Sequence, residues 1–292
     1  NENKKRMKQN KNIAILGAGE SGVGAAVLAK KQGYEVFVSD FGKIKQGYKC
    51  LLEQEQIEWE EGTHSLERIL NANEIVKSPG IPDKVEVVRL AIEKSIPVIS
   101  EIEFGSRYTD AKLICITGSN GKTTTTMLTH HMLEKAGLNV GLAGNIGDSF
   151  AMQVATENYD YYVIELSSFQ LDGVREFKAD VAILLNITPD HLDRYEYKFE
   201  NYVKSKFRIT NNQTNEDYFI YCKDDEAIVN ALSSQNIQAI QLPFSIKEEL
   251  KTGAYLNKNE EIVFNSTNQP QTMSIHDLAL NGKHNIYNSM AA

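Results

Sequence analysis

The stretch TGSNGKTT, residues 117–124, decides the expected fold of this 292-residue chain. It follows the apolar run LICI at 113–116, which predicts a buried strand, and it precedes apolar residues spaced like one face of a helix. Unpaired backbone N–H groups and the dipole at the start of such a helix favour an anion. Lys122 would bring a positive charge to the terminal phosphates, and the Thr123 hydroxyl would reach Mg²⁺. The stretch therefore predicts a phosphate-binding loop for a nucleoside triphosphate.

The loop departs from the general phosphate-binding motif at one position. Where that motif has its first glycine, this chain has Ile116. What remains is the shorter pattern G-x-x-G-K-T. A loop that contains glycine and lysine by chance, without a ligand, is the alternative if the stretch is considered alone.

The composition is typical of a globular protein with about two domains. Hydrophobic residues make up 41% and charged residues 24% of the chain, and no apolar run approaches the ~20 residues of a membrane-spanning helix. The net charge of −8 argues against a general nucleic-acid-binding protein, and the polar start 1–12 is unlike a secretory signal. The scattered cysteines Cys50, Cys115 and Cys222 predict neither disulfides nor a zinc site. We expect a monomer in the cytoplasm that binds neither nucleic acid nor a membrane.

Apolar runs alternate with helical stretches, which predicts βαβ units and parallel sheets. In the first block we expect helices at 23–31 and 85–94 and strands at 12–16, 35–39, 74–77 and 97–99. In the second block we expect strands at 113–116, 140–143, 161–166, 181–186 and 218–222, then an antiparallel edge of 254–256 and 261–264. The expected fold class is α/β: an N-terminal Rossmann-like parallel-sheet domain, 1–107, and a central P-loop ATPase-type α/β domain, 108–292.

The first block carries a second anion-binding pattern. The segment GAGESG at 17–22 is a complete G-x-G-x-x-G between a strand and a helix, and Asp40 closes the next strand. Alone, this pattern predicts an NAD-dependent oxidoreductase with Asp40 at a ribose hydroxyl. A tight turn without a ligand, or a loop that holds the diphosphate of another nucleotide, are the alternatives. The turn SPGIP at 78–82 also follows a strand, at the edge where ligands of open α/β sheets bind.

Polar residues follow several strands of the second block. Glu165 ends an apolar strand, where a carboxylate beside a phosphate loop commonly serves Mg²⁺; an ordinary acid at a strand edge is the alternative. Asn145, in the segment GNIG, could cap a helix or contact phosphate. His191 lies between aspartates in NITPDHLDRY, residues 186–195, and is a candidate metal ligand or phosphate contact.

Three further polar residues carry no signal of their own. Ser167 and Gln170 would most often be turn residues. Lys206 lies on the expected helix 202–210, where a solvated basic face is the default interpretation.

The order of these motifs resembles the Mur ligases, the ATP-dependent ligases of peptidoglycan synthesis. In chain order the motifs are TGSNGKTTT, GNIG, ELSSFQL, NITPDHLDRY, YVKSKFRI and LNGKHNIYN. The resemblance spans residues 12–292, and the short phosphate loop with Ile116 is the family's own form. The segments GAGESG and SPGIP, together with ELSSFQL and DHLDRY, point to the family members that add D-glutamate.

The resemblance implies roles for individual residues. It implies that ATP is bound by Gly118, Ser119, Asn120, Gly121, Lys122, Thr123, Thr124, Asn285 and Asn288. It implies that the first block holds a UDP-sugar substrate instead of NAD, with substrate contacts from Gly19, Glu20, Ser21, Asp40, Ser78, Gly80, Asn145, Ser167 and Gln170. Asp40 would lie near the uracil; a basic residue often follows that aspartate in the family, whereas Phe41-Gly42-Lys43 follows here.

The resemblance also implies the metal site and the catalytic residues. Two Mg²⁺ ions would be held by Thr123, Glu165, His191 and Lys206, the last as a carbamate formed with CO₂. Lys122, His191 and Lys206 would be catalytic.

The implied activity is ATP-dependent amide formation between UDP-N-acetylmuramoyl-L-alanine and D-glutamate, through an acyl phosphate. Members of the family have a third, C-terminal domain that binds the incoming amino acid. We expect these 292 residues by themselves to bind the UDP-sugar but to ligate poorly or not at all. An NAD-dependent oxidoreductase and a non-catalytic nucleotide-binding module remain the alternative functions.

Overall fold

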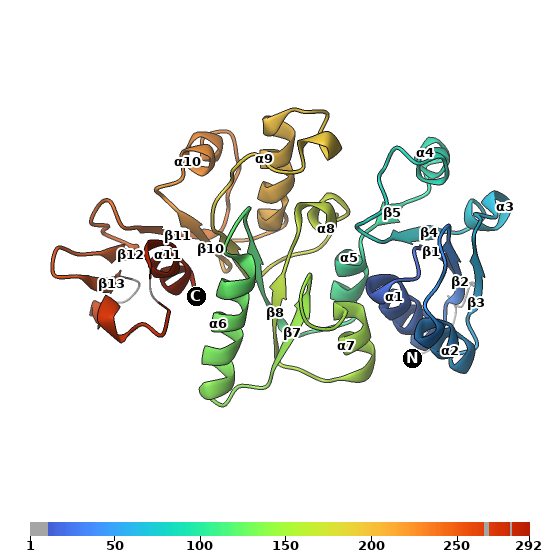
Figure 1. Ribbon diagram of the computed structural model, residues 1–292, viewed down its shortest axis with the longest axis horizontal. Helices are drawn as coiled ribbons and strands as arrows, with labels where there is room; N and C mark the ends of the chain where they lie inside the picture. Colours follow the sequence, from blue (N-terminus) through green and yellow to red (C-terminus); the bar gives the residue numbers. More distant parts are fainter. Residues whose placement is uncertain (1–10, 266–268, 281) are drawn as a thin grey trace. The chain divides into compact units, whose positions relative to one another are not determined.

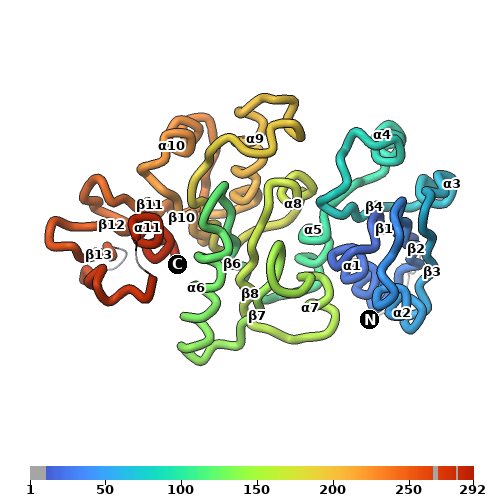
Figure 2. Tube along the Cα trace, in the orientation of Figure 1, coloured from blue at the N-terminus to red at the C-terminus, as the bar shows by residue number. Residues whose placement is uncertain are grey.

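The computed structural model describes residues 11–265, 269–280 and 282–292. The chain forms two compact units, of which the first comprises the chain up to Thr109 together with Asp148–Asn158 and Asp172–Arg175. The second comprises Asp110–Gly147, Tyr159–Leu171 and Glu176–Ala292. Each unit has its own sheet (Figure 1), and Figure 2 follows the course of the chain from the N-terminus to the C-terminus. The boundary expected between residues 107 and 108 remains a prediction.

The first unit is built on a five-stranded parallel sheet in the order β3-β2-β1-β4-β5. Its strands are β1 (Asn12–Leu16), β2 (Glu35–Asp40), β3 (Glu58–Glu61), β4 (Glu74–Lys77) and β5 (Val98–Ile99). Its helices are α1 (Glu20–Lys31), α2 (Gln46–Gln54), α3 (Leu66–Ile69), α4 (Glu86–Glu93), α5 (Glu101–Ser106) and α7 (Phe150–Thr156). The strand order reverses between β1 and β4, which is where open α/β sheets bind ligands.

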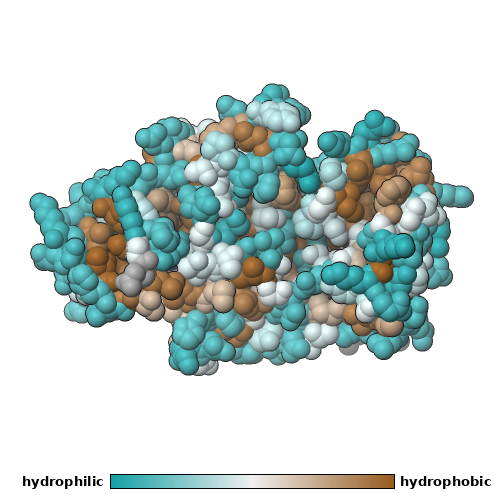
Figure 3. All heavy atoms as spheres, viewed as in Figure 1, coloured by the Kyte–Doolittle hydropathy of each residue, from teal (hydrophilic) through white to brown (hydrophobic). Residues whose placement is uncertain are grey.

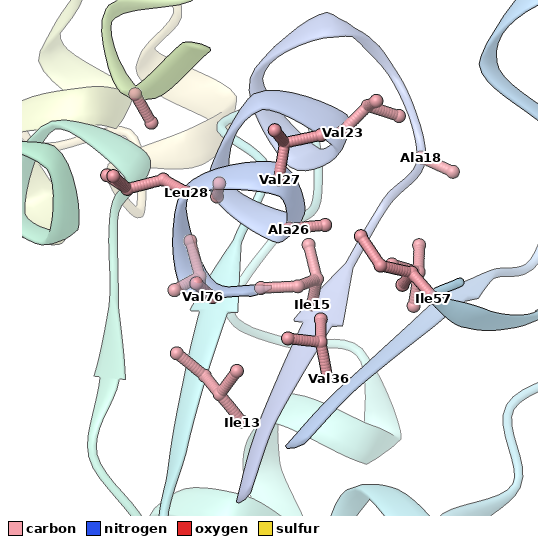
Figure 4. Packing of buried hydrophobic residues seen from close by; sticks show 14 of the residues in the cluster. Ile13, Ile15, Ala18, Val23, Ala26, Val27, Leu28, Val36, Ile57 and Val76 are labelled. Atoms are coloured by element: carbon pink, nitrogen blue, oxygen red, sulfur yellow. The ribbon is translucent and has the colours of Figure 1, made fainter. Parts of the chain in front are cut away.

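One of two core clusters of this unit lies between the sheet and helix α1, and the other includes Leu16 of β1 and Val88 of α4. Figure 4 shows Ala26 and Val27 of α1 gathered with Ile15 of β1 and Val76 of β4. Alanines and glycines on α1 let α7 approach closely: a Cβ at Gly24 would lie 2.0 Å from Ser149 Oγ. Helix α7 therefore completes the first unit although it lies far along the chain.

The second unit is built on a nine-stranded sheet in the order β14-β13-β12-β11-β10-β9-β6-β8-β7. Its strands are β6 (Lys112–Thr117), β7 (Val140–Gly144), β8 (Tyr161–Glu165), β9 (Val181–Leu184), β10 (Tyr218–Cys222), β11 (Ile240–Ser245), β12 (Gly253–Leu256), β13 (Glu261–Asn265) and β14 (Gln271–Ser274). Its helices are α6 (Lys122–Lys135), α8 (Ser168–Asp172), α9 (Phe199–Phe207), α10 (Glu226–Leu232) and α11 (Lys283–Ala291), with short 3₁₀ turns at Leu192–Arg194, Arg208–Thr210 and Ile275–Asp277. All pairs from β7 to β12 are parallel, and β12, β13 and β14 pair antiparallel.

The topology of the second unit brings three strand ends together. Strand β6 lies between β8 and β9, and the phosphate loop leaves β6 toward α6. Glu165 at the end of β8 pairs in register with Ile116, and Leu184 at the end of β9 pairs with Thr117. Residues that follow β6, β8 and β9 therefore meet at the carboxyl edge of the sheet.

The α/β class and most expected strands are confirmed, including the antiparallel edge formed by β12 and β13. Three strands were missed. Strand β3 reads EWEE and lies at a sheet edge, so it lacks an apolar run; β11 is interrupted by Pro243; and β14 is mostly exposed. The helix expected at 202–210 spans Phe199–Phe207 instead, and a 3₁₀ turn follows it.

The outer surface is dominated by polar residues on the face shown in Figure 3, and hydrophobic residues form only small areas there. Within residues 11–265, 269–280 and 282–292, no helix is both long enough and apolar enough to cross a bilayer.

Candidate active site

The phosphate loop closes onto helix α11 through Gly121. This residue is the N-cap of α6 and has φ +84°, a left-handed conformation that favours glycine. A Cβ at this position would lie 2.5 Å from Asn288 Oδ1. Lys122 Nζ donates to the carbonyl oxygens of Gly118 and Ser119 at 2.9 and 3.1 Å, so its ammonium lies over the loop itself.

The segment after β9 holds the loop in place. Asn186 Oδ1 accepts from the Asn120 amide at 2.8 Å, and Asn186 Nδ2 donates to the Asn120 carbonyl at 2.9 Å. The Asn186 carbonyl accepts from the Ser119 amide at 2.9 Å, and Ser119 Oγ accepts from the Thr188 amide at 2.9 Å. Asn186 was not singled out from the sequence, although an asparagine directly after a buried strand is a recognisable signal for such a contact.

Glu165 connects the loop to the strand on its other side. Its side chain is buried, with Oε2 accepting from Thr123 Oγ1 at 2.8 Å and Oε1 accepting from Asn145 Nδ2 at 2.8 Å. The Asn145 amide also donates to the Glu165 carbonyl at 2.9 Å. Hydroxyl, carboxylate and amide oxygens are hard donors of the kind that Mg²⁺ prefers. Thr123 and Glu165, which were predicted from the sequence as ligands of Mg²⁺, are thus joined by a hydrogen bond, and their role as metal ligands remains a prediction.

Lys206 is buried, so the default interpretation of a solvated basic face does not apply to it. Only 1% of the residue is exposed, whereas Lys204 on the same helix is exposed. Its Nζ lies 3.5 Å from Thr117 Oγ1 at the end of β6 and 4.8 Å from the centroid of the Tyr202 ring. A buried lysine beside a strand end of the phosphate loop is the kind of costly placement that function explains more readily than stability.

His191 lies in an exposed turn after β9. It has φ +50°, its Nε2 lies 3.5 Å from Asp190 Oδ2, and its ring centroid lies 5.2 Å from that of Phe169. Within the described ranges, no group of three or more His, Cys, Asp or Glu side chains is arranged to hold a metal ion. The predicted four-residue metal set therefore remains a prediction, of which the structure joins Thr123 and Glu165.

Ser167 and Gln170 bond to each other at the start of α8. The backbone amide and the hydroxyl of Ser167 donate to Gln170 Oε1 at 2.9 and 3.0 Å. This pairing orients both side chains in the turn directly after Glu165.

A cavity of about 590 Å³ lies beside the phosphate loop and is lined by Asn285 and Asn288, both predicted to bind ATP. Asp224 and Tyr287 also line it, and neither was expected from the sequence. Tyr287 Oη donates to Asp224 Oδ2 at 2.8 Å, which ties α11 to the segment after β10. The two residues lie 63 positions apart in the chain, so no local pattern could have joined them.

A second cavity, of about 680 Å³, lies in the first unit and is lined by Gly17, Gly19, Asp40, Ser78 and Gly80 among others. Glu20 and Ser21 begin α1 directly after Gly19. Both oxygens of Asp40 accept backbone amides at 2.7 Å, from Ala18 and from Gly42.

Two lining residues of this second cavity were not selected from the sequence. Phe41 and His64 both belong to its wall. They follow strands β2 and β3, and β3 was not expected, so the placement of His64 at this edge was not predictable.

Together, the fold and these sites define an α/β protein with a phosphate-binding loop and a separate Rossmann-like unit. The Mur ligase middle domain family matches residues 116–292, and the MurD N-terminal domain family matches residues 12–87. The chain belongs to the Mur ligase family.

Curated relatives are similar over nearly the whole chain. The UDP-N-acetylmuramoylalanine--D-glutamate ligase of Bacteroides fragilis is 56% identical over 282 residues, which cover 97% of this chain and 63% of that protein. The same-named ligase of Christiangramia forsetii is 55% identical, with the same coverage. The chain thus spans about 63% of the length of the curated relatives it matches.

Solved structures support the fold. The UDP-N-acetylmuramate:L-alanyl-gamma-D-glutamyl-meso-diaminopimelate ligase of Neisseria meningitides has a TM-score of 0.63 at 21% identity, with 96% of this chain and 91% of that chain covered. The murein peptide ligase of Psychrobacter arcticus has a TM-score of 0.61 at 19% identity, with 96% and 64% covered.

Proposed function

We propose that this chain belongs to an ATP-dependent ligase that joins D-glutamate to UDP-N-acetylmuramoyl-L-alanine. The observation that carries the proposal is the phosphate loop, with Lys122 over its carbonyls and Thr123 bonded to the buried Glu165. The names of the relatives that are 55% and 56% identical support the same substrates. The Rossmann-like unit supports a second nucleotide site, with the diphosphate of the UDP-sugar at Gly19, Glu20 and Ser21.

The reaction consists of two steps at one carbonyl. The carboxylate of the L-alanyl group attacks the γ-phosphorus of ATP, ADP leaves, and an acyl phosphate forms. The amine of D-glutamate then attacks the acyl carbon, the C–O bond to phosphate breaks, and the amine loses a proton as the amide forms. Positioning and charge neutralisation account for most of the catalysis in phosphoryl transfer.

Residues of the loop supply both contributions. The backbone amides at the start of α6 face the phosphates, and Lys122 moves from its own loop carbonyls to neutralise the transferring group. Asn285 and Asn288, which line the neighbouring cavity, contact the adenine end. Asn145, Ser167 and Gln170 orient the muramoyl-alanyl part beside the loop.

The oxygen donors around the loop fit Mg²⁺, which supplies electrostatic stabilisation of the transferring phosphoryl group. Thr123 and Glu165 would hold one ion. His191 and Lys206 are proposed for a second ion, with Lys206 carrying a carbamate. The burial of Lys206 supports this modification, because a carbamate replaces a buried cation with an anionic oxygen ligand. After labelled bicarbonate is added, ¹³C NMR should show a carbamate carbon signal in the unsubstituted protein, and Lys206→Met should lose that signal. If the unsubstituted protein shows no such signal, Lys206 does not belong to the metal set.

The cytoplasm is the proposed location. Cys50 is exposed as a free thiol, and Cys115 and Cys222 are buried free thiols, which are typical of a reducing compartment.

The test is a pair of calorimetric titrations of the 292-residue chain, one with ATP and Mg²⁺ and one with UDP-N-acetylmuramoyl-L-alanine. We expect each ligand to bind, and we expect Lys122→Ala to weaken ATP binding at least tenfold while it leaves the UDP-sugar unaffected. Lys135→Ala, at the far end of the same helix, is the matched control and should change neither. Tight binding of NADH in competition with the UDP-sugar would favour the oxidoreductase instead.

A further inference from the structure

The cavity of the first unit has two aromatic rings in its wall. Phe41 is 72% exposed, and its ring centroid lies 5.8 Å from that of His64. The same cavity includes Gly17 and Gly19 of the glycine loop, where phosphates are favoured. Aromatic faces stack on nucleobases, whereas the glycine loop offers backbone donors for anions. The ring-lined part of the cavity therefore suits the base of a bound nucleotide.

Behind these rings, a carboxylate begins a chain of hydrogen bonds. Glu60 Oε1 accepts from Ser39 Oγ at 2.6 Å and from the Ser65 amide at 2.7 Å, and Glu60 Oε2 accepts from the Ser65 hydroxyl. Burial acts to raise the pKa of Glu60, but the hydrogen bonds from Ser39 and Ser65, together with a smaller electrostatic contribution from His64, outweigh it, and the pKa lies below its ordinary value. Glu60 is therefore an ionised acceptor at neutral pH.

An ionised carboxylate determines the direction of the next two hydrogen bonds. It can only accept, so the single hydrogen of the Ser39 hydroxyl is donated toward Glu60. The other near neighbour of that hydroxyl, the Thr63 carbonyl at 3.4 Å, is also an acceptor. Ser39 Oγ must then accept from His64 Nδ1, which lies 2.7 Å away. The neutral form of His64 is thereby the Nδ1–H tautomer, whose Nε2 carries a lone pair.

Nε2 is the polar atom that His64 can offer to a ligand in the cavity. Among the described residues, it has no hydrogen-bond partner. A nitrogen lone pair requires a donor. Uracil presents N–H at its ring position 3, whereas cytosine presents an unprotonated nitrogen at the same position.

We propose that His64, held by Ser39 and Glu60, is a specificity-determining residue that accepts the ring N–H of uracil and disfavours cytosine. Phe41 stacks on the base. This inference rests on the proposed function, in which the first unit holds a uridine diphosphate, and it names the side chain that distinguishes the base. A lone pair facing another lone pair leaves both acceptors unsatisfied, so we expect at least a tenfold preference for uracil.

The first experiment leaves the protein unchanged and alters the ligand. Calorimetric titrations of the 292-residue chain compare UDP, CDP and UDP methylated at ring nitrogen 3. We expect UDP to bind at least tenfold more tightly than either of the other two nucleotides. Equal affinity for UDP and its methylated form would overturn the inference, whatever any variant does.

The second experiment alters the side chains. His64→Phe keeps a ring in the wall but removes the acceptor, and Ser39→Ala releases Nδ1; both should bring the ratio of UDP to CDP affinity close to one. His131→Phe, the same substitution on an exposed histidine of α6, should leave the ratio unchanged. A ratio that persists in His64→Phe would overturn the role of His64.

A histidine ¹⁵N spectrum tests the tautomer directly. It should show the Nδ1–H tautomer for His64 in the unsubstituted protein and a tautomer mixture in Ser39→Ala. An Nε2–H tautomer in the unsubstituted protein would contradict the proposal.

The outcomes separate this inference from the proposed function. If UDP and CDP bind equally well, the nucleotide site stands and only the selection by His64 is wrong. If neither binds, the UDP-sugar site of the proposed function is wrong and the inference is wrong with it.

Discussion

Two buried carboxylates, those of Glu165 and Glu101, differ in the contacts that surround them. Glu165 receives Thr123 on one oxygen and Asn145 on the other, so it orients two side chains at the phosphate loop. Glu101 receives Ser149 Oγ at 2.7 Å and the Ala151 amide at 2.6 Å, both on Oε1. Burial raises the pKa of Glu101 to about 7, and these two hydrogen bonds only partly oppose it. The first carboxylate links the phosphate loop to the segment after β7, and the second links α5 to α7.

Glu101 should make the first unit less stable as the pH rises. An acid whose pKa is raised on folding favours the folded state below its unfolded pKa, and that contribution is lost as pH increases through the folded value of about 7. From pH 4.5 to pH 7.5 we expect the free energy of unfolding to lose up to about 3 kcal/mol from this group. Glu101→Gln keeps the accepting oxygen and should abolish this pH dependence. Urea unfolding followed by the single tryptophan, Trp59, measures it.

Glu93→Gln, on the exposed side of α4, is the control and should retain the slope of the unsubstituted protein. An identical pH dependence in Glu101→Gln would show that folding does not raise the pKa of this carboxyl.

Gly121 should be intolerant of a side chain for two separable reasons. Gly121→Ala places a Cβ at a positive φ, which costs about 1–2 kcal/mol, and it also collides with Asn288 Oδ1. Gly137→Ala has φ +82° but nothing within 4 Å, so it reports the backbone cost alone. We expect Gly121→Ala to lower the free energy of unfolding by more than Gly137→Ala and to weaken ATP binding, whereas Gly137→Ala leaves ATP binding unchanged. Equal effects of the two substitutions on both measurements would mean that α11 does not press on the loop.

At the scale of elements, the packing of helices depends more on how closely their backbones approach than on helix propensity. Helix α1 carries small residues on the face that meets α7, and Lys31 Nζ donates to the Ala155 carbonyl at 3.0 Å at the end of the contact. In the second unit, Asp225 caps α10 through the Ile228 amide and also accepts from the Ile187 amide, both at 3.0 Å. The contacts of Lys31 with Ala155 and of Asp225 with Ile187 join segments that lie far apart in the chain, whereas the Asp225 cap on α10 is local.

Gly24→Ala and Gly47→Ala should therefore have opposite effects. Both glycines are helical, and alanine is intrinsically the better helix former by about 1 kcal/mol. Gly47 has nothing within 4 Å of an added Cβ, so Gly47→Ala should stabilise the first unit by roughly that amount. At Gly24 the added Cβ meets Ser149 Oγ at 2.0 Å and the Met152 amide nitrogen at 3.1 Å, so Gly24→Ala should destabilise it by about 1–3 kcal/mol. The midpoints of urea unfolding, followed by Trp59 fluorescence, compare the two variants. If both substitutions stabilise the unit, α7 can shift to accommodate the added Cβ at Gly24 at little energetic cost.

At the scale of the whole molecule, each unit has its own sheet and its own cavity beside a glycine-containing loop. The cavity of about 680 Å³ belongs to the first unit and the cavity of about 590 Å³ to the second. A ligand stabilises the part of a protein that binds it, by about 2.7 kcal/mol at a concentration of one hundred times Kd. Two nucleotides should therefore protect two different parts of the chain.

Hydrogen exchange measures this protection. UDP-N-acetylmuramoyl-L-alanine should slow exchange in segments 17–22 and 78–82, and ATP with Mg²⁺ should slow it in segment 117–124. Lys122→Ala should lose the second effect only. Protection of both sets of segments by ATP alone would contradict the assignment of one nucleotide to each unit.

Much of the fold was predictable because its signals are local. Apolar runs such as 12–16 and 218–222 coincide with strands β1 and β10, and the G-x-x-G-K-T pattern marks the start of α6. These features arise from side-chain periodicity and turn chemistry within a few residues. Strand β3 was not predicted because its sequence, EWEE, lies at a sheet edge and contains no apolar run.

The site was predictable only in part, for the same reason. Lys122, Thr123 and Glu165 occupy a known pattern or a strand end, and the structure joins the last two through a hydrogen bond. The contacts of Asp224 with Tyr287 and of Ser39 with His64 link residues 63 and 25 positions apart. No local sequence pattern predicts that such residues will be in contact.

The amino-acid sequence by itself determined the α/β class, the two glycine-containing loops and the membership of the Mur ligase family. Tertiary structure alone decided that α7 packs in the first unit, that Lys206 is buried, and that Ser39 contacts both Glu60 and His64. The physical reason is the separation along the chain over which each kind of interaction acts. Backbone preference and hydrophobic period act between neighbours in the chain, whereas burial and hydrogen-bond direction depend on residues that only folding brings together.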